Sequence, residues 1–341
     1  MSEAQAIGVA LIGAGMVAGT HLAAIRDTPE ARLIGICARS RSRAEAIADG
    51  VRVYKDVAAV AADPKVAAAI VITPPNVRAE VIGPLVAAGK HILLEKPMAR
   101  DTEEAAQVVA LCQEAGVTLG IVFQHRMRAA SQKAAELVAS GALGALGLAE
   151  IAVPWWRDQL YYDEPGRGTY KRDGGGVLIS QAIHTIDLAL GLTGPVSAVQ
   201  AMTATTGLHR MEAEDFAVAG LRFASGAVGS LTASTASYPG AAESIRLHFE
   251  NASLHLKAGV LTVSYRDGRV ETFGAVSGTG GGADPMAFTH AWHQAVLADF
   301  CAAIRDRRDP AVSGQAALAT HRLIDAITAS ARSGRLVEVG T

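Results

Sequence analysis

Two residues of this sequence, Lys96 and His184, have side chains and surroundings suited to moving a proton. Lys96 belongs to the tripeptide Glu95-Lys96-Pro97, directly after a short apolar run. A lysine in that position can take the proton of a hydroxyl group as hydride leaves the adjoining carbon, and can return it in the reverse direction. Partial burial and a neighbouring cation would weaken its hold on the proton. The competing interpretation is a surface lysine in a loop.

His184 lies in a polar stripe on an otherwise apolar segment that follows the triplet Gly174-Gly175-Gly176. If this segment is a helix, Ser180, His184 and Asp187 are spaced i, i+4 and i+7 and share one face. Such a stripe needs an aqueous cleft or a satisfied buried network, whereas a lone histidine more often belongs to the core. We therefore predict that these three residues belong to a site that contacts a substrate.

The segment Gly13-Ala14-Gly15-Met16-Val17-Ala18-Gly19 has the composition of a phosphate-binding turn. Gly13 permits a tight turn, and Gly15 lets the backbone approach a pyrophosphate. Met16 and Val17 open a helix whose N-terminal amides and dipole favour the same anion. The spacing is G-x-G-x-x-x-G rather than the usual G-x-G-x-x-G, and a glycine triplet alone is weak evidence. We predict a dinucleotide site because the triplet lies at the first strand–helix junction. A tight packing turn is the alternative.

The residues after the second predicted strand bear on which nicotinamide dinucleotide is used. An NAD-type domain usually ends this strand with Asp or Glu, which binds the ribose hydroxyls. Here the position holds Ala38, and no acidic residue occurs before Glu45. The residues between are basic or hydroxylic, and Arg39, Ser40, Arg41 and Arg43 are candidate ligands of a 2′-phosphate. We therefore favour NADP over NAD and leave the use of both open.

Predicted strands and helices alternate over the first 125 residues. Apolar runs predict strands at 7–12, 32–37, 66–72, 91–94 and 117–122, with helices at 21–27, 42–49, 79–88 and 102–115. This alternation predicts an α/β fold whose first domain, residues 1–125, is a doubly wound parallel sheet of the Rossmann type.

From residue 126 onward the pattern changes to closely spaced strand-like runs with glycine-rich turns. A helix at 130–140 precedes strands at 148–155, 196–203, 215–223, 227–235, 244–249, 253–256 and 260–265, and helices at 287–305 and 314–331 close the chain. Short turns between such runs predict an antiparallel sheet. We expect it to form a second domain over residues 126–341.

Composition excludes several classes of protein. The 341 residues carry a net charge of -2 with 19% charged residues, so neither nucleic acid nor an anionic membrane is an expected partner. The apolar stretch 7–25 is interrupted by glycines and by His21, which argues against a membrane span. Three widely spaced cysteines predict neither a disulfide framework nor a zinc site and favour a cytoplasmic location. His290 and His293 share a helix face, where core packing is favoured over a metal site.

Taken together, the sequence resembles the Gfo/Idh/MocA family, the relatives of glucose–fructose oxidoreductase and inositol dehydrogenase. The matching features are the strand followed by Gly13-Ala14-Gly15, the tripeptide Glu95-Lys96-Pro97, and the glycine triplet followed by His184-Thr185-Ile186-Asp187. The resemblance covers nearly the whole chain. It implies a Rossmann domain, a second α/β domain with a large, mostly antiparallel sheet, NAD or NADP as cofactor, and a sugar, inositol or sugar derivative as substrate.

The resemblance also implies roles for individual residues. It makes Lys96 and His184 the catalytic pair and places Glu95 with Lys96 near the nicotinamide. It assigns an adenosine-side loop and a further cofactor contact, which here are Thr73-Pro74-Pro75-Asn76 and Trp156-Arg157. Many members carry an aspartate where this chain has Ser180, which can orient a histidine but cannot stabilise an imidazolium by charge.

Further interpretations stay open at this point. Arg167 could bind substrate hydroxyls or a carboxylate bidentately, or serve its own loop. Relatives that use NAD transiently to break a glycosidic bond, and nucleotide-sensing regulators without turnover, are alternative functions, although the presence of both Lys96 and His184 favours an enzyme. The runs 215–223 and 227–235 carry small or apolar residues on both faces, so we expect a homodimer or homotetramer.

Overall fold

The computed structural model describes residues 6–278 and 288–340. They form two compact units, Met1–Gln124 with Thr289–Leu318, and His125–Phe288 with Ala319–Thr341. The chain passes to the second unit after residue 124, close to the expected boundary, and residues 289–318 belong to the first unit.

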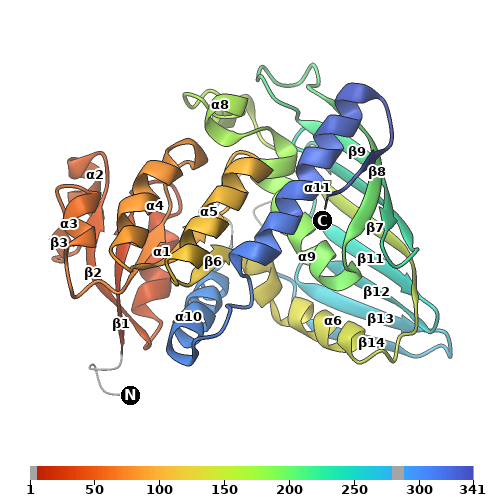
Figure 1. Ribbon diagram of the computed structural model, residues 1–341. Coiled ribbons are helices and arrows are strands. Elements are labelled where there is room, and N and C mark those ends of the chain that lie inside the picture. The colour runs from red at the N-terminus through yellow and green to blue at the C-terminus, as the bar shows by residue number, and fades with distance from the viewer. Residues whose placement is uncertain (1–5, 279–287, 341) are drawn as a thin grey trace. The chain divides into compact units, whose positions relative to one another are not determined.

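The first unit contains a parallel sheet with the strand order β3-β2-β1-β4-β5-β6 (Figure 1). Its strands are β1 (Ile7–Ile12), β2 (Ala31–Cys37), β3 (Arg52–Val53), β4 (Ala68–Val71), β5 (His91–Glu95) and β6 (Leu119–Val122). Every residue of β1, β4 and β6 is buried, as expected for strands covered on both faces. The order confirms the predicted doubly wound sheet.

Helices cover the first sheet. They are α1 (Ala18–Arg26), α2 (Arg41–Ile47), α3 (Val57–Ala61), α4 (Arg78–Ala87), α5 (Thr102–Glu114) and α10 (Ala291–Asp306). Ser40, Asp56 and Asp101 cap the N-termini of α2, α3 and α5 with their side chains. The helix α10 packs on α1 because one of its faces is apolar, and that face buries Val296, Leu297 and Phe300. Residue 287, where a helix was expected to begin, lies outside the described residues.

The second unit contains a sheet with the order β14-β13-β12-β11-β7-β10-β9-β8-β15. Its strands are β7 (Leu146–Pro154), β8 (Val196–Ala204), β9 (Phe216–Phe223), β10 (Val228–Ser234), β11 (Ser244–Phe249), β12 (Ala252–Lys257), β13 (Val260–Tyr265), β14 (Val270–Gly274) and β15 (Val337–Glu338). All neighbours are antiparallel except β7 and β10. The prediction of a mostly antiparallel sheet is confirmed, with β14 and β15 in addition.

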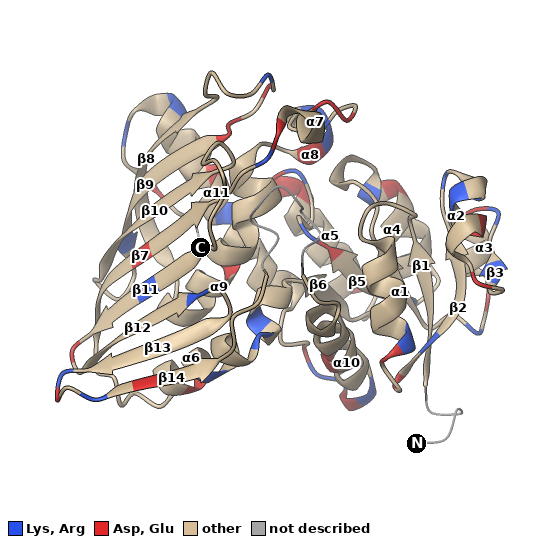
Figure 2. Ribbon diagram, turned by 180° about the vertical axis from the view of Figure 1, so that it is seen from behind, with Lys and Arg blue, Asp and Glu red and all other residues tan. Residues whose placement is uncertain are grey.

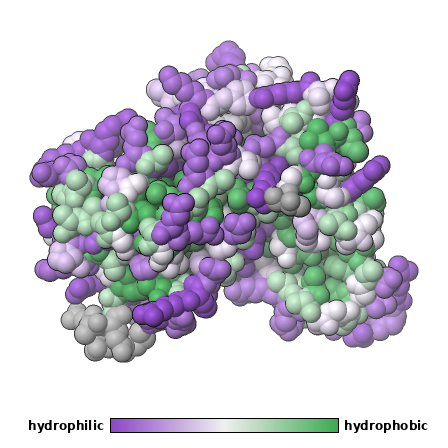
Figure 3. All heavy atoms as spheres, in the orientation of Figure 1, coloured by the Kyte–Doolittle hydropathy of each residue, from purple (hydrophilic) through white to green (hydrophobic). Residues whose placement is uncertain are grey.

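Helices lie on one side of this second sheet (Figures 1 and 2). They are α6 (Ala129–Ala139), α9 (Ile183–Thr193) and the part of α11 (Gly314–Ser333) that belongs to this unit. Strand residues alternate between the two faces, so that Ala217, Leu221 and Leu231 are buried toward the helices. On the side drawn in Figure 3, apolar areas are bordered by hydrophilic residues.

The helix α9 is the most apolar helix of the second unit and continues a π-helical turn, Leu178–Ala182. The helical stretch Tyr170–Thr193 is long and apolar enough to cross a membrane, but 83% of its most apolar window is buried inside the protein. It is therefore packed as a core helix of the second unit.

Candidate functional site

The turn between β1 and α1 fits a dinucleotide phosphate. Gly13 has φ +121°, and a Cβ there would lie 2.6 Å from Cγ1 of Ile72, so only glycine fits this turn. A Cβ at Gly15 would meet no atom within 4 Å, which leaves open space in front of the backbone. The first turn of α1 has no side-chain cap at Val17, so its amides are available to an anion. Met16 is exposed beside this turn.

The loop after β4 contains the predicted adenosine-side residues. Thr73 and Pro74 precede a 3₁₀ turn, Pro75–Val77, which includes Asn76. The hydroxyl of Thr73 is buried and has no hydrogen-bond partner among the described residues, whereas its carbonyl oxygen accepts a bond from Nε of Arg78 at 3.0 Å. A buried hydroxyl needs a hydrogen-bond partner, and a polar group of a bound ligand could be that partner.

The segment from Ala38 to Arg43 joins β2 to α2. The side chain of Ser40 caps α2 by accepting the backbone N–H of Arg43 at 3.4 Å, so its oxygen is already engaged. Arg41, the third arginine expected near a 2′-phosphate, pairs with Glu45 at 2.7 Å and is therefore partly engaged. Arg39 and Arg43 are exposed, and they are the two guanidinium groups of this segment that remain available to a ribose phosphate. The basic start of α2 is blue in Figure 2.

Glu95 and Lys96 stand where β5 ends, at the carboxyl edge of the first sheet. Oε1 of Glu95 accepts a bond from Nε2 of His21 at 2.8 Å, and Oε2 accepts the backbone N–H of Lys96 at 3.1 Å. Lys96 itself is half-buried, and the bond from Lys96 to Pro97 is cis. The sequence analysis had no signal for the contact with His21, which is 74 residues away.

His184 lies at the start of α9, next to the π-helical turn that carries Ser180. Its ring is buried and stacks on the ring of His125, with centroids 4.8 Å apart and planes at 25°. The π turn changes the rotation between residues 178 and 183, so the simple i, i+4 relation of Ser180 to His184 does not hold. Such turns are frequent at functional sites.

The glycine triplet sets where this helix begins. Gly174 and Gly175 have φ values of 86° and 157°, and a Cβ at Gly176 would lie 1.8 Å from the carbonyl oxygen of Glu214. The carboxylate of Glu214 accepts the backbone N–H groups of Gly176 and Leu178, both at 3.1 Å. Burial raises the pKa of Glu214 despite these bonds. The glycines therefore let a buried carboxylate hold the start of the helix.

Asp187 has an internal partner that the sequence analysis did not assign. Its carboxylate is fully buried and accepts two bonds from Arg126, from Nε at 2.6 Å and from Nη2 at 2.7 Å. Thr320 of α11 adds a bond at 3.4 Å. Burial raises the pKa of Asp187, and the guanidinium opposes that shift. The ion pair between Asp187 and Arg126 therefore links α9 to the segment before α6.

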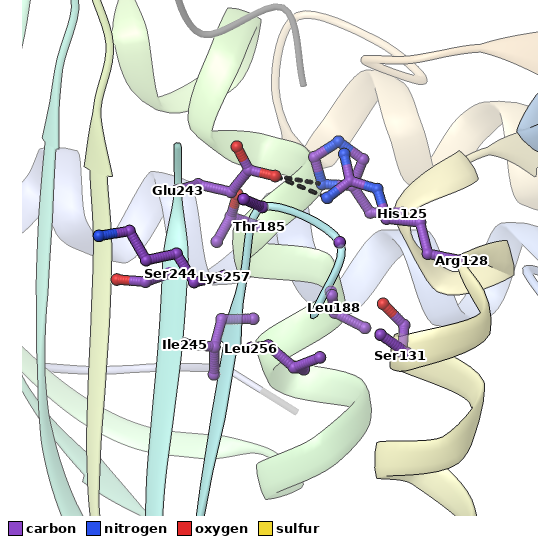
Figure 4. A pocket seen from close by; sticks show the side chains of 13 residues that line it. His125, Arg128, Ser131, Thr185, Leu188, Glu243, Ser244, Ile245, Leu256 and Lys257 are labelled. Atoms are coloured by element: carbon purple, nitrogen blue, oxygen red, sulfur yellow. Dashed lines mark hydrogen bonds and ion pairs between the residues drawn. The ribbon is translucent and has the colours of Figure 1, made fainter. Parts of the chain in front are cut away.

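A second buried network lies behind α9 and surrounds a cavity of about 20 Å³, roughly the room of one water molecule. Figure 4 shows Arg128 and His125 pointing toward the carboxylate of Glu243. Arg128 binds that carboxylate at 2.6 Å, and the indole N–H of Trp155 donates to it at 3.3 Å. This cavity is too small for a sugar.

The predicted contacts around residues 156–167 form an aromatic and cationic group. Trp156 packs edge-on against Tyr238, and Arg157 is buried with Nη1 donating to the carbonyl oxygen of Trp156 at 2.7 Å. Arg167 is paired with Glu164 and lies 4.3 Å from the ring centroid of Tyr161. The hydroxyl of Tyr161 in turn accepts a bond from Gln181 at 3.1 Å, which connects this loop to the π turn.

The candidate residues therefore belong to two sets. The first unit holds the phosphate turn, the Thr73 loop, the start of α2, Glu95 and Lys96. The second unit holds Trp156, Arg157, Arg167, Ser180, His184 and Asp187. Sequence reasoning missed the buried partners His21, His125 and Glu243, because a pairing across 74 or more residues leaves no trace in local spacing.

Comparisons with known proteins match both units. Residues 7–123 match the oxidoreductase family with an NAD-binding Rossmann fold, GFO_IDH_MocA, and residues 131–255 match the GFO/IDH/MocA C-terminal domain. The chain is similar to the D-xylose 1-dehydrogenase (NADP(+)) 2 of Haloferax volcanii, with 30% identity over 89% of this chain and 91% of that protein. It is also similar to the D-apiose dehydrogenase of Paraburkholderia graminis, with 26% identity over 97% of this chain and 89% of that protein.

Among solved structures, the WlbA dehydrogenase from Bordetella pertussis, in complex with NADH and UDP-GlcNAcA, has a TM-score of 0.83 and 29% identity. The match covers 98% of this chain and 99% of that one. A levoglucosan dehydrogenase in complex with NADH and levoglucosan has a TM-score of 0.84 at 24% identity, which shows a shared fold.

Proposed function

Because the chain belongs to the Gfo/Idh/MocA family of NAD-binding oxidoreductases, which act on CH–OH groups, we propose that it transfers hydride between nicotinamide and a sugar. The reacting group is a secondary alcohol or ketone of a sugar, inositol or sugar derivative. The observation that carries the proposal lies in the first unit, where the open phosphate turn at Gly15 and Lys96 stand at the same carboxyl edge of one parallel sheet.

Each group of residues has a separate task in this proposal. The backbone from Gly13 to Val17 holds the pyrophosphate, and the loop at Thr73 holds the adenosine side. The nicotinamide, when bound, accepts or supplies the hydride. Lys96 takes the hydroxyl proton on its Nζ during oxidation and returns it during reduction. We assign His184 to the same reaction as a second proton-transfer group, and we propose that Trp156, Arg157, Arg167 and Ser180 border the substrate and the nicotinamide.

Asp187 is proposed to act on the substrate only through α9. Both carboxylate oxygens are bonded to Arg126, so a direct substrate contact would have to displace a buried ion pair. Holding α9 in place also holds His184, three residues earlier on the same helix.

A substrate panel tests the proposed reaction. Cyclitols, aldoses and sugar acids are supplied with NAD and with NADP, and the absorbance of the reduced nicotinamide is followed. We expect turnover with at least one sugar or cyclitol, in keeping with the relatives named for D-xylose and D-apiose. Glycoside cleavage without accumulation of reduced nicotinamide would instead support the glycosidase alternative. Dinucleotide binding without any turnover would support a regulator.

We expect NADP to be preferred over NAD. Arg39 and Arg43 are exposed beside Ala38, and the similar Haloferax volcanii enzyme is named for NADP(+), although the WlbA structure contains NADH. One charge-assisted bond to the 2′-phosphate is worth about 1.5 kcal/mol or more, so kcat/KM should be about tenfold higher with NADP.

The control for this expectation is Arg41→Ala, because Arg41 is already paired with Glu45. Arg39→Ala or Arg43→Ala should reduce the preference for NADP over NAD in kcat/KM, mainly by raising KM for NADP. Arg41→Ala should reduce this preference less than either of them. A tenfold preference of the unmodified protein for NAD would contradict the assignment.

We also propose a homodimer or homotetramer in the cytoplasm, in keeping with three buried free cysteines. The face of the second sheet away from the helices carries the half-buried Phe216 and Val218 and the exposed Val228. The neighbouring strands β7 and β11 place Glu150 opposite Arg246 on that face, so the surface is mixed rather than wholly apolar. Light scattering should give a multiple of 35.2 kDa, and a monomer at micromolar concentration would overturn the proposal.

A further inference from the structure

Beside Lys96 in the chain, the first unit buries a cluster of three titratable side chains that the proposed reaction does not use. Glu95, His21 and His293 are 6%, 2% and 3% exposed. Oε1 of Glu95 accepts a bond from His21 at 2.8 Å and lies 3.7 Å from Nε2 of His293, and Oε2 accepts the backbone N–H of Lys96 at 3.1 Å. Both oxygens of the carboxylate are therefore engaged, one of them by the backbone N–H of Lys96.

The carboxylate of Glu95 is ionised in this environment. Burial alone would raise the pKa of Glu95, but the imidazoles of His21 and His293 hold it well below its usual value. Burial lowers the pKa of His293 and the charge of Lys96 lowers it further, so His293 is neutral near pH 7. Burial also lowers the pKa of Arg78 to about 10, opposed by the negative charge of Glu95.

The titratable groups near Glu95 are His21 from α1, Arg78 from α4 and His293 from α10, and its Oε2 accepts the backbone N–H of the adjoining Lys96. The ligand atoms of His21, Glu95 and His293 lie within 4.8 Å of one another, close enough in principle for a metal ion. A divalent cation there would break the bond between His21 and Glu95 and would stand near the positive charge of Arg78, which opposes its binding.

We propose that Glu95, fixed by His21, is a positioning residue for Lys96. It holds the backbone at Lys96 and keeps one permanent negative charge behind the amine. This inference rests on the proposed function of Lys96. In alcohol oxidation the hydride leaves the carbon for the nicotinamide, the hydroxyl proton moves to Nζ, and the carbonyl forms. Glu95 takes no proton, and its charge stabilises the ammonium group that results.

The central variant is Glu95→Gln, which keeps the shape and one oxygen acceptor but removes the charge. An opposite charge nearby shifts a titration by about one to three pH units, so Lys96 should titrate about one unit lower in this variant. The readout is an NMR titration of lysines labelled at Cε, in which the Lys96 signal is identified by its loss in Lys96→Met. This readout needs no turnover, so it stays valid even if the substrate panel finds no activity.

If turnover is found, the acid limb of kcat/KM for alcohol oxidation should move to lower pH by the same amount in Glu95→Gln, with Kd for the dinucleotide unchanged. The matched control is Asp27→Asn. It removes a carboxylate that bonds His290 between the same two helices, α1 and α10, but does not touch Glu95. In Asp27→Asn, the NMR titration of Lys96 and the acid limb of kcat/KM should both have the same midpoints as in the unmodified protein.

A second pair of variants covers the case in which Glu95→Gln does not fold. His21→Gln keeps a side-chain N–H donor and should titrate as the unmodified protein does, whereas His21→Ala should displace the Lys96 titration. An unchanged Lys96 titration in Glu95→Gln or His21→Ala, with only a lower Tm, would make the cluster purely structural and overturn the proposal. One tightly held metal ion per chain in the purified protein, lost together with activity on chelation, would overturn it as well.

Discussion

Lys96→Met should lower kcat for sugar oxidation by at least about a hundredfold, the usual range for a general acid–base group. Methionine has nearly the length of lysine but no nitrogen, so the hydroxyl proton has no acceptor at this position. The phosphate turn at Gly15 is untouched, and the dinucleotide should still bind. Kinetics with saturating cofactor, together with a fluorescence titration of the reduced dinucleotide, separate the two effects.

The matched control for that experiment is Lys55→Met, since the side chain of Lys55 is 78% exposed in the same unit. It should turn over as the unmodified protein does. His184→Asn should lower kcat nearly as far as Lys96→Met. If it changes only KM, His184 binds the substrate and does not transfer protons. Turnover near the original rate in Lys96→Met would remove Lys96 from the mechanism.

Arg126→Met should destabilise the second unit by about 3 to 5 kcal/mol, as expected when one partner of a buried ion pair is removed. The carboxylate of Asp187 is fully buried and would keep only the longer bond from Thr320. Gly191 lies on the same helix, and a Cβ there would be 3.4 Å from Cζ of Arg126, so the guanidinium packs directly against this helix. Urea denaturation measures the loss.

Arg269→Met is the comparison for this measurement, because Arg269 and its partner Asp267 lie in an exposed hairpin of the same unit. Its denaturation midpoint should hardly move. Arg126→Met combined with Asp187→Asn should recover part of the loss, because the uncompensated charge is then absent. Equal midpoints for Arg126→Met and the unmodified protein would show that the pair contributes nothing to stability.

Apolar runs and glycines in the sequence predicted the elements that are formed by neighbouring residues of the chain. The strand, glycine turn and helix from Ile7 to Arg26 follow one another in sequence, and this strand–turn–helix unit could therefore be predicted without a structure. The short strand β3 and helix α3 were missed because runs of two and five residues carry too little periodicity.

The partners of the candidate residues could not be predicted in the same way. The sequence showed Arg126 and Asp187 separately, but their pairing spans 61 residues and depends on how α9 packs. The π turn at residues 178–182 is likewise set by the glycine triplet and Glu214, which lie on different segments. Side-chain types therefore identified Lys96 and His184 as candidates, while the groups that hold them came only from the three-dimensional structure.

The return of the chain to the first unit affects how this protein can be made in the cell. The 164 residues from 125 to 288 must leave the ribosome before α10 exists, and at 5 to 20 residues per second that takes roughly 8 to 33 seconds. During this interval the nascent first unit lacks the helix that covers α1 and the segment whose Ser313 pairs with Gly120 on β6. Its apolar surface and open sheet edge are then exposed, which is the situation in which chaperones bind nascent chains.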